Sequence, residues 1–311
     1  MARRFLRSNC YRYGNDNQGL KIMKSRNFIS LKFLLKHEDI CDLDNVLHLE
    51  KLIGQHSPRD ITEVVSTSNW YEMAPEITVF DILSNEISDM QLRSAIIGKL
   101  SQVFGLYATD DIDNNNATEC ALKKYDDSFY YSIISPVDTI KDLEECETVS
   151  TPDDYNRIHE KHLSLCPESN EDYALRCVYI FDKVKFSDNF SNTLSTLGNN
   201  QGITDFSIPI TKALTILNRL DPAIRNIQEA MHWIHTESGF ECSPQGANKG
   251  HLFPTIQLDD GTERQINCEF HMKINASNLA DNLKHHSRIY FGLMPVGQCK
   301  HTYLLHCGEH L

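Results

Sequence analysis

The sequence lacks the long apolar runs that membrane-spanning helices require. None of its 311 residues belong to a run approaching roughly 18 consecutive apolar residues. The opening residues also lack the apolar core of a signal peptide, because polar residues follow the first arginines. Hydrophobic residues make up 41% of the chain and charged residues 23%, which is ordinary for a globular protein. We therefore expect a cytoplasmic protein with no membrane partner.

Paired cysteine motifs and the common nucleotide-binding motifs are also missing. Ten cysteines are spread along the chain without a Cys-x-x-Cys pair, so we expect reduced thiols and no disulfide framework. There is no Walker loop, dinucleotide-binding glycine motif, G-x-S-x-G elbow or set of kinase motifs. These absences give no support to the enzyme classes that depend on those motifs.

Charge is distributed unevenly along the chain, whose net charge is −13. Residues 1–36 carry nine Lys or Arg and one acidic residue, whereas residues 110–172 carry seventeen acidic and five basic residues. The acidic stretch should repel phosphate and is the expected place for a protein partner. From Ser207 onward nine basic residues nearly balance ten acidic ones, and nine of the fourteen histidines lie there.

Length and pattern divide the chain into four regions, because 311 residues exceed one ordinary core. Residues 1–36 are expected to form a basic arm. Residues 37–106 are expected to form a mainly helical domain, since apolar positions before Phe104 recur with helical spacing. Residues 107–206 are interpreted as an acidic connecting region with a few strands, at Phe129–Ser135 and Tyr173–Phe186.

Residues 207–311 are expected to contain two helices followed by a small antiparallel sheet. Asp221-Pro222 predicts the start of the second helix, with an N-cap and a first-turn proline. Beyond that helix the apolar period changes to two, and Asp259-Asp260-Gly261-Thr262 favours a hairpin turn. Further strands are expected at 288–293 and 301–307. The chain is therefore assigned to the α+β class, with a mainly helical N-terminal region before the final sheet.

The last strands carry many polar side chains that are suited to acid–base chemistry. Strand alternation places His271 and Lys273 on one face, and likewise Arg288 and Tyr290. RNA cleavage without a metal needs a base for the 2′-hydroxyl, a cation for the phosphorane and an acid for the leaving oxygen. His, Arg, Lys and Tyr fill these roles near neutral pH. The predicted catalytic residues are His271, Lys273, Arg288, Tyr290, His306 and His310.

This C-terminal pattern of two helices followed by a small sheet resembles the RelE/ParE-type toxin fold. The segments that carry the resemblance are His271-Met272-Lys273, Arg288–Phe291 and the closing Tyr303–Leu311. The resemblance covers about residues 207–311. It implies a compact domain of helices followed by a sheet and, in the RelE branch, RNA cleavage by dispersed basic residues. Carried onto this chain, the implied positions are Arg288, Tyr290 and either His306 or His310.

The first hypothesis is therefore a toxin- or defence-type protein of the toxin–antitoxin kind. Its C-terminal domain would contact RNA or the ribosome, or cleave RNA as a metal-independent endoribonuclease. The residue pattern does not decide between binding and cleavage. Convergence of the cationic and imidazole side chains on one open surface would favour this hypothesis.

Two other interpretations stay open. The same fold could serve only for protein contacts, as an adaptor in a multi-component bacterial system. Alternatively, a zinc ion could stabilise the domain, since Cys-x-x-His and His-x-x-x-His spacings are usable by this metal. The zinc ligands would be Cys268, His271, His306 and His310. No other cofactor is expected. Arg288 could also pair with Glu269 or Glu309 across strands.

Overall fold

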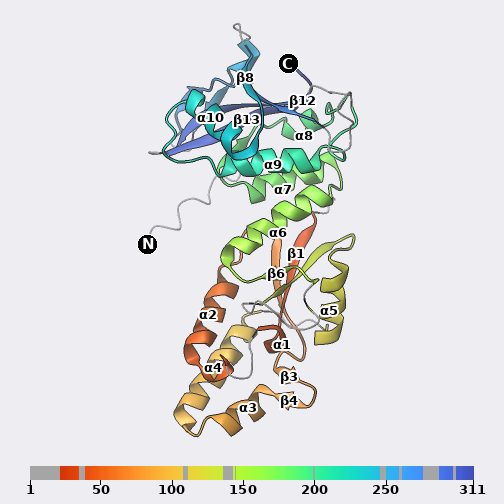
Figure 1. Cartoon of the computed structure of the whole chain (residues 1–311), viewed down its shortest axis with the longest axis vertical. Coiled ribbons are helices and arrows are strands. Elements are labelled where there is room, and N and C mark those ends of the chain that lie inside the picture. Colours follow the sequence, from red (N-terminus) through yellow and green to blue (C-terminus); the bar gives the residue numbers. More distant parts are fainter. Residues whose placement is uncertain are drawn as a thin grey trace. The chain divides into compact units, whose positions relative to one another are not determined.

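The computed structural model describes residues 22–34, 39–107, 111–135, 143, 145–198, 200–245, 250–258, 261–275, 287–296 and 299–311. Within these ranges the chain forms two compact units, which we call the N-terminal unit, Ile22–Lys161, and the C-terminal unit, His162–Leu311 (Figure 1). Most of the basic arm expected at 1–36 lies outside the described residues. Across the described parts of the chain, no helix is long and apolar enough to cross a membrane.

The N-terminal unit is built on a four-stranded sheet in which all neighbouring strands are parallel. In spatial order the strands are β2 (Thr62–Ser66), β1 (Lys24–Ile29), β5 (Phe129–Ile134) and β6 (Thr148–Val149). Parallel neighbours need long crossover connections, and those between β1 and β2 and between β2 and β5 contain helices. The connecting elements are α1 (Leu31–Leu34), η1 (Asp39–Cys41), α2 (Leu43–Gly54), β3 (Glu72–Ala74), β4 (Ile77–Thr78), α3 (Val79–Glu86), α4 (Met90–Gly105) and α5 (Asn114–Lys123).

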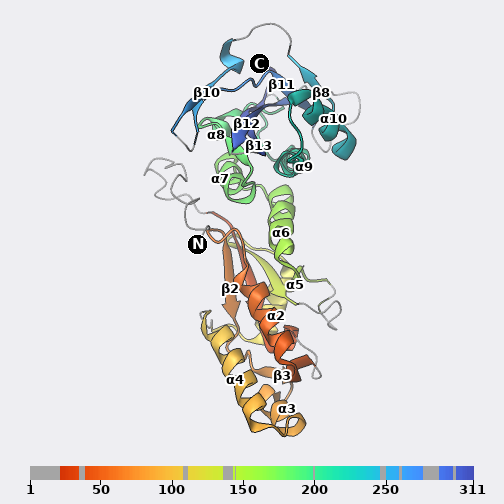
Figure 2. The same cartoon turned by 90° about the vertical axis from the view of Figure 1, so that its left-hand side faces the viewer.

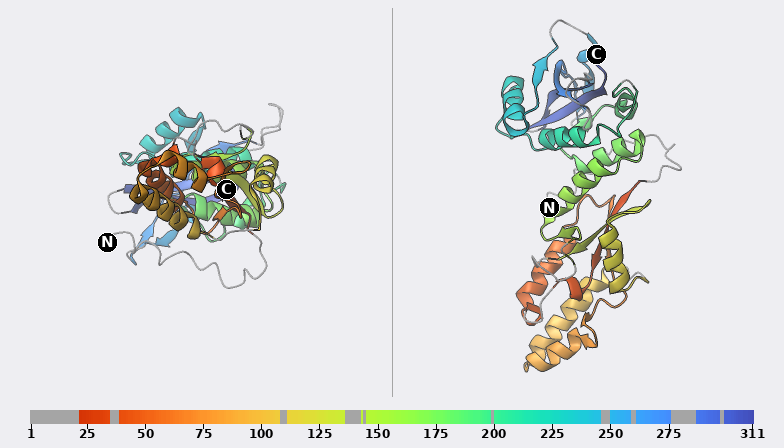
Figure 3. Two further views of the ribbon diagram at one scale, coloured as in Figure 1. Left: turned by 90° about the horizontal axis from the view of Figure 1, so that it is seen from below. Right: turned by 45° about the vertical axis from the view of Figure 1, so that its right-hand side comes forward.

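Apolar side chains cover both faces of this parallel sheet, as is usual for parallel strands. Ile29 and Ile134 lie in a core that also contains residues of α2 and α4. Phe28 and Ile133, their neighbours along the strands, lie in a second core with Ala117 of α5. Figure 3 accordingly shows α2 and α5 on opposite sides of the strands. Alternation along each strand thus supplies both cores.

This sheet differs from the arrangement expected from the sequence. One sheet joins strands from the expected basic arm, the expected helical domain and the expected acidic connecting region. The strand expected at Phe129–Ser135 corresponds to β5, but β1 and β2 were missed. The physical reason is that these buried strands contain polar residues that satisfy one another. Ser25 and Ser132 both hydrogen-bond to the side chain of Asn27, so the apolar pattern is interrupted.

The C-terminal unit contains a five-stranded sheet with the order β7-β13-β12-β11-β8. Neighbouring strands are antiparallel except β13 and β7, which are parallel. The strands are β7 (Val184–Phe186), β8 (Cys242–Pro244), β11 (Phe270–Ile274), β12 (Ser287–Val296) and β13 (Cys299–Gly308). A sheet at the end of the chain was expected, and its parallel edge strand was not.

Helices cover one face of this sheet. They are α7 (Asn170–Ile180), α8 (Phe190–Leu194) and α9 (Ser207–Asn218), with α10 (Ile227–Ser238) beside β8. The helix α6 (Pro152–Leu165) precedes them in the chain. Figure 2 shows α7, α8 and α9 together on one side of β12 and β13. On that face Met272, Ile289 and Cys307 are fully buried. Their strand neighbours, at alternate positions, form the opposite face.

Two secondary-structure predictions in this unit were wrong. Residues 173–186 do not form one strand, because Ser169 caps a helix by accepting a hydrogen bond from the backbone of Asp172, and α7 runs to Ile180 before β7 begins. The second helix also begins later than expected. Asp221 caps only a turn, by accepting from the Ala223 amide, and Asn226 is the N-cap of α10.

The expected hairpin is present, although its strands are short. β9 (Thr255–Gln257) pairs antiparallel with β10 (Glu263–Gln265), and Gly261 has a φ of +80° at the turn. This hairpin and the 3-10 helix η2 (Gly250–Leu252) precede a segment that crosses the sheet. A Cβ atom on Gly292 would lie 2.4 Å from the carbonyl oxygen of Asn267, so only glycine permits this crossing.

Candidate functional site

Strand register brings five of the six predicted catalytic residues onto one face of the C-terminal sheet. His271 of β11 lies opposite Tyr290 of β12, and Tyr290 lies opposite His306 of β13. The neighbouring pair on the same face is Lys273 and Arg288. A register shift immediately after Tyr290 is what keeps His306 level with it. The predicted face is therefore real in the structure, and it is opposite the face covered by α7, α8 and α9.

The sixth residue, His310, comes from the segment after β13 and packs onto the same group. Its ring centroid lies 6.0 Å from that of His271 and 6.4 Å from that of Tyr290. The Tyr290 ring is 5.1 Å from His271 and 5.9 Å from His306. We call His271, Tyr290, His306 and His310 the imidazole cluster.

The imidazole cluster is covered by the last residues of the sequence. Tyr290 has no exposed surface, and His271 and His306 are 5% and 7% exposed. The Leu311 amide donates to Tyr290 Oη at 3.1 Å, Tyr290 Oη donates to Gln245 Oε1 at 3.0 Å, and Gln245 Nε2 donates to the Leu311 carbonyl at 2.9 Å. In this closed ring of hydrogen bonds the Tyr290 hydroxyl both donates and accepts, and the segment that contains Leu311 covers His271, Tyr290 and His306. His310, which belongs to that segment, is itself exposed.

Further hydrogen bonds hold the two strand histidines. His271 Nε2 shares a hydrogen bond with Ser243 Oγ at 3.2 Å. His306 Nε2 lies 2.9 Å from the Glu309 carbonyl oxygen, which can only accept, so this nitrogen carries the proton.

Burial determines the protonation states in the imidazole cluster. Burial first, and then the charge of Arg288, lower the pKa of His271 to about 4. Burial also lowers the pKa of His306 and raises that of Tyr290. Both strand histidines are therefore neutral near pH 7 and the phenol keeps its proton. A neutral imidazole can accept a proton, so these residues suit a general base better than a general acid.

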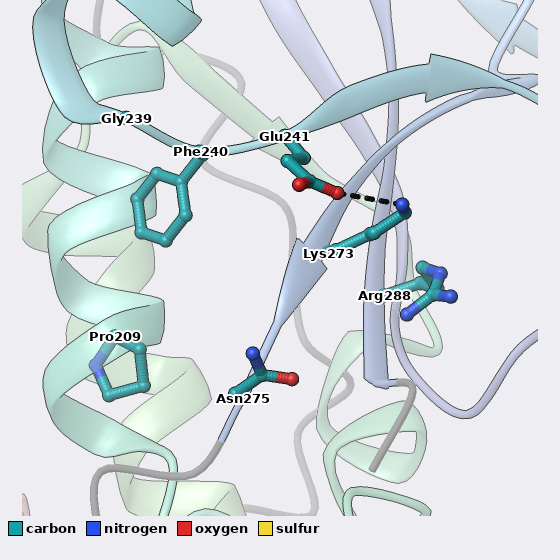
Figure 4. Close-up of a pocket in the computed structure, with 7 residues that line it drawn as sticks. All are labelled: Pro209, Gly239, Phe240, Glu241, Lys273, Asn275 and Arg288. Carbon is teal, nitrogen blue, oxygen red and sulfur yellow. Dashed lines mark hydrogen bonds and ion pairs between the residues drawn. The ribbon is translucent and has the colours of Figure 1, made fainter. Parts of the chain in front are cut away.

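Beside the cluster lies a cavity of about 560 Å³ at the end of β11 and β12. Figure 4 shows Phe240 and Pro209 on one side of it and Lys273 and Arg288 on the other. We call it the Arg288 pocket. It is lined by Pro209, Gly239, Phe240, Glu241, Lys273, Asn275 and Arg288.

The two cations of the Arg288 pocket differ in their partners. Lys273 Nζ is 2.7 Å from Glu241 Oε2, and both side chains are largely exposed. Arg288 is only 7% exposed, and its Nη1 donates to the Ser287 carbonyl at 3.1 Å. Its Nε is buried and has no hydrogen-bond partner among the described residues. The ion pairs with Glu269 or Glu309 considered from the sequence are not formed within the part of the chain that the structure describes.

The geometry gives the zinc hypothesis no ligand set. Across the described ranges, no group of three or more His, Cys, Asp or Glu side chains is placed to hold a metal ion. Cys268 lies in an apolar cluster with Ile256 and Met294, and burial raises its pKa to about 12. Zinc stays an untested prediction without geometric support.

Part of the acidic stretch, the expected site for a protein partner, is occupied by internal ion pairs. Asp172 and Arg176 are 2.6 Å apart on successive turns of α7, with side chains 2% and 1% exposed. Nearer the surface, Asp154 pairs with Arg157, and the buried Glu147 pairs with the exposed Lys161. A protein partner at this stretch stays a prediction.

Sequence reasoning missed the residues that complete the site from outside the three central strands. Ser243 and Gln245 come from β8 and the residue after it, and Phe240 from the end of α10. A signal was present, because Gly239 adopts a left-handed conformation that ends α10 and redirects the chain toward the sheet.

Comparisons with protein-family models, curated proteins and solved structures found no significant match.

Proposed function

We propose that the C-terminal unit contacts RNA through the sheet face that carries Lys273 and Arg288. The observation that supports this proposal best is the buried guanidinium of Arg288, whose Nε has no partner in the described structure and which lines a cavity. A buried charge without a partner is unfavourable, so an anion in the cavity would stabilise this arrangement. Phosphate oxygens match the planar donors of arginine.

The charge distribution around the sheet agrees with a local contact to a phosphate backbone. Lys273 lies opposite Arg288 in the strand register and lines the same pocket, where its charge is paired with that of Glu241. RNA is the polyanion that the sequence resemblance to RelE-type toxins implies. A toxin or defence role for this contact rests on that resemblance alone and is part of the proposal.

The contact is tested by fluorescence anisotropy of a labelled single-stranded RNA with the full chain at low salt. Arg288→Ala should weaken binding at least tenfold, because a charge-assisted phosphate contact is worth about 1.5–3 kcal/mol. Arg264→Ala is the matched control, since Arg264 is exposed on β10 of the same unit and does not line the pocket. Equal loss in both variants, or no RNA binding by the wild type, would favour the protein-adaptor interpretation instead.

The convergence of the imidazole cluster favours a second candidate, cleavage of the bound RNA. In such a step neutral His271 would take the 2′-hydroxyl proton, O2′ would bond to phosphorus, and the P–O5′ bond would break as O5′ takes a proton from a water molecule. Arg288 would stabilise the extra negative charge on the phosphorane. Because residues 309–311 cover the cluster, this reaction requires that segment to move away first.

Cleavage is tested by incubating 5′-labelled RNA with the full chain and resolving the products on a denaturing gel. Fragments ending in 2′,3′-cyclic phosphate, formed by the wild type and lost in His271→Ala and His306→Ala, would support cleavage. Binding without such fragments would leave the unit as an RNA-contacting domain only. Products that disappear on metal chelation would point away from this chemistry.

A further inference from the structure

We infer that the Arg288 pocket holds one unpaired nucleotide, with its phosphate on Arg288 and its base against Phe240. This inference rests on the proposed RNA contact and specifies the ligand of the same site. The cavity of about 560 Å³ lies within the range of roughly 300–1,000 Å³ that small-molecule sites occupy. A single phosphate ion would leave most of that volume unused.

The charges of the pocket match one phosphate group. Glu241 is already neutralised by Lys273 at 2.7 Å, so this pair contributes no net charge. Arg288 forms no ion pair with a described residue, and its only hydrogen bond within the described residues goes from Nη1 to a backbone carbonyl. Nε is enclosed by protein atoms, so Nη2 is the guanidinium nitrogen left to bind a phosphate oxygen. A hydrogen bond from this charged group to a phosphate is of the strong, charge-assisted kind.

The opposite wall of the pocket is suited to a nucleobase. Phe240 is half-buried, lines the cavity and stands across from Arg288 (Figure 4). The Lys212 ammonium lies 5.4 Å from the centre of its ring, which helps to fix the ring in place. Proteins bind unpaired bases by stacking them on aromatic side chains, and Pro209 extends this apolar wall.

Polar groups between the two walls can serve the ribose. Glu241 can accept hydrogen bonds from hydroxyl groups, and the Asn275 amide can both accept and donate them. Two apolar groups, the arginine guanidinium and two groups for hydroxyls thus lie around one cavity. A nucleoside monophosphate carries the complementary set.

The test is isothermal titration calorimetry of the full chain with adenosine 5′-monophosphate, ribose 5-phosphate, adenosine and inorganic phosphate. The nucleotide should bind about 5- to 100-fold more tightly than ribose 5-phosphate, because stacking of one base is worth about 1–3 kcal/mol. Phe240→Leu should remove most of that preference and leave ribose 5-phosphate binding unchanged. Arg288→Lys should weaken both phosphate ligands and leave adenosine unaffected, and far-UV circular dichroism checks that each variant is folded.

Equal binding of the nucleotide and ribose 5-phosphate by the wild type would overturn the inference, as would an unchanged preference in Phe240→Leu. The same protein is also titrated with single-stranded RNA. If RNA binding is observed and requires Arg288 while the mononucleotide does not bind, the proposed RNA contact is supported and the proposed nucleotide pocket is rejected. If neither binds, both proposals fall. Competition between the mononucleotide and RNA would show that they share the pocket.

Discussion

At the scale of single residues, Arg288 has the least expected environment in the molecule. Strand alternation predicted its face correctly, but the sequence could not show that the guanidinium would be buried with its Nε lacking a hydrogen-bond partner among the described residues. Long charged side chains at strand ends usually reach solvent. Here the side chain is enclosed at the beginning of β12, where Asn275 and Phe240 line the same cavity.

Replacement of Arg288 by methionine should abolish RNA binding without lowering the stability of the fold. A buried, incompletely paired charge opposes folding, and its replacement by an apolar side chain of similar length is often neutral or stabilising by about 1 kcal/mol or more. We expect Arg288→Met to unfold in urea at the wild-type midpoint or above it, while RNA affinity is lost. A clear fall in the urea midpoint would show that Arg288 is instead needed for the fold.

His271 should make the stability of the C-terminal unit depend on pH. Its pKa is about 4 in the folded chain and near 6.5 when unfolded, so between these values the unfolded state binds more protons. Stability is therefore present above pH 6.5 and is lost as the pH falls toward 4. The contribution lost between pH 7 and pH 5 is about 2 kcal/mol, and burial of His306 acts in the same direction.

Urea unfolding at pH 7 and pH 5 measures this loss. His271→Gln should lose less stability over the same interval than the wild type, because glutamine does not titrate. Comparison of the two proteins removes the contribution of the carboxyl groups, which titrate in both. An identical loss in wild type and variant would show that His271 is not held neutral by its surroundings.

At the scale of elements, the segment Glu309–Leu311 acts as a cover for the imidazole cluster. Tyr290 holds this cover through the hydrogen bonds with Gln245 and the Leu311 amide. Tyr290→Phe removes the hydroxyl, so that the Gln245 side chain and the Leu311 amide each lose a hydrogen bond. This loss should destabilise the cover by about 1–3 kcal/mol. Amide hydrogen exchange at Leu311 should then become faster by roughly 5- to 100-fold. Unchanged exchange would mean that other contacts hold the segment.

The sequence predicted the elements whose pattern is local and missed those whose partners are distant. The Asp-Asp-Gly-Thr turn predicted the β9–β10 hairpin, because turn chemistry depends on neighbouring residues. Alternation also predicted that Lys273 and Arg288 share a face with His271 and Tyr290. The parallel strands β1 and β2 were missed, because their order in the sheet depends on crossovers that no local pattern encodes.

The position of His306 illustrates a limit of strand periodicity. The register of β12 and β13 shifts between Tyr290 and Phe291. Because of this irregularity, simple alternation of side chains along β13 does not by itself predict which face of the sheet His306 lies on. Its place beside Tyr290 follows from the shift, which only the folded structure shows. The covering role of residues 309–311 was likewise invisible, since it depends on Gln245, far away in the sequence.

At the scale of the whole molecule, a net charge of −13 opposes the approach of RNA from a distance. Binding should therefore rely on few phosphate contacts. Because Lys273 is paired with Glu241, Arg288 is the one cation of the pocket that can neutralise a phosphate, and affinity for single-stranded RNA should fall with salt at a log–log slope of about −0.7. Anisotropy titrations between 50 and roughly 300 mM salt measure this slope. A slope steeper than about −3 would indicate a larger basic surface elsewhere.

The parallel pairing of β7 with β13 determines which piece of the chain can be produced alone. β7 supplies residues 184–186 to the sheet edge, and α7 and α8 cover its apolar face, yet all three precede Ser207. An expression fragment starting at Ser207 would leave the β7-facing edge of β13 unpaired and expose its buried side chains to water, which favours aggregation. A fragment that starts at Pro152 retains all of these elements, and it is the form in which the unit should be purified separately.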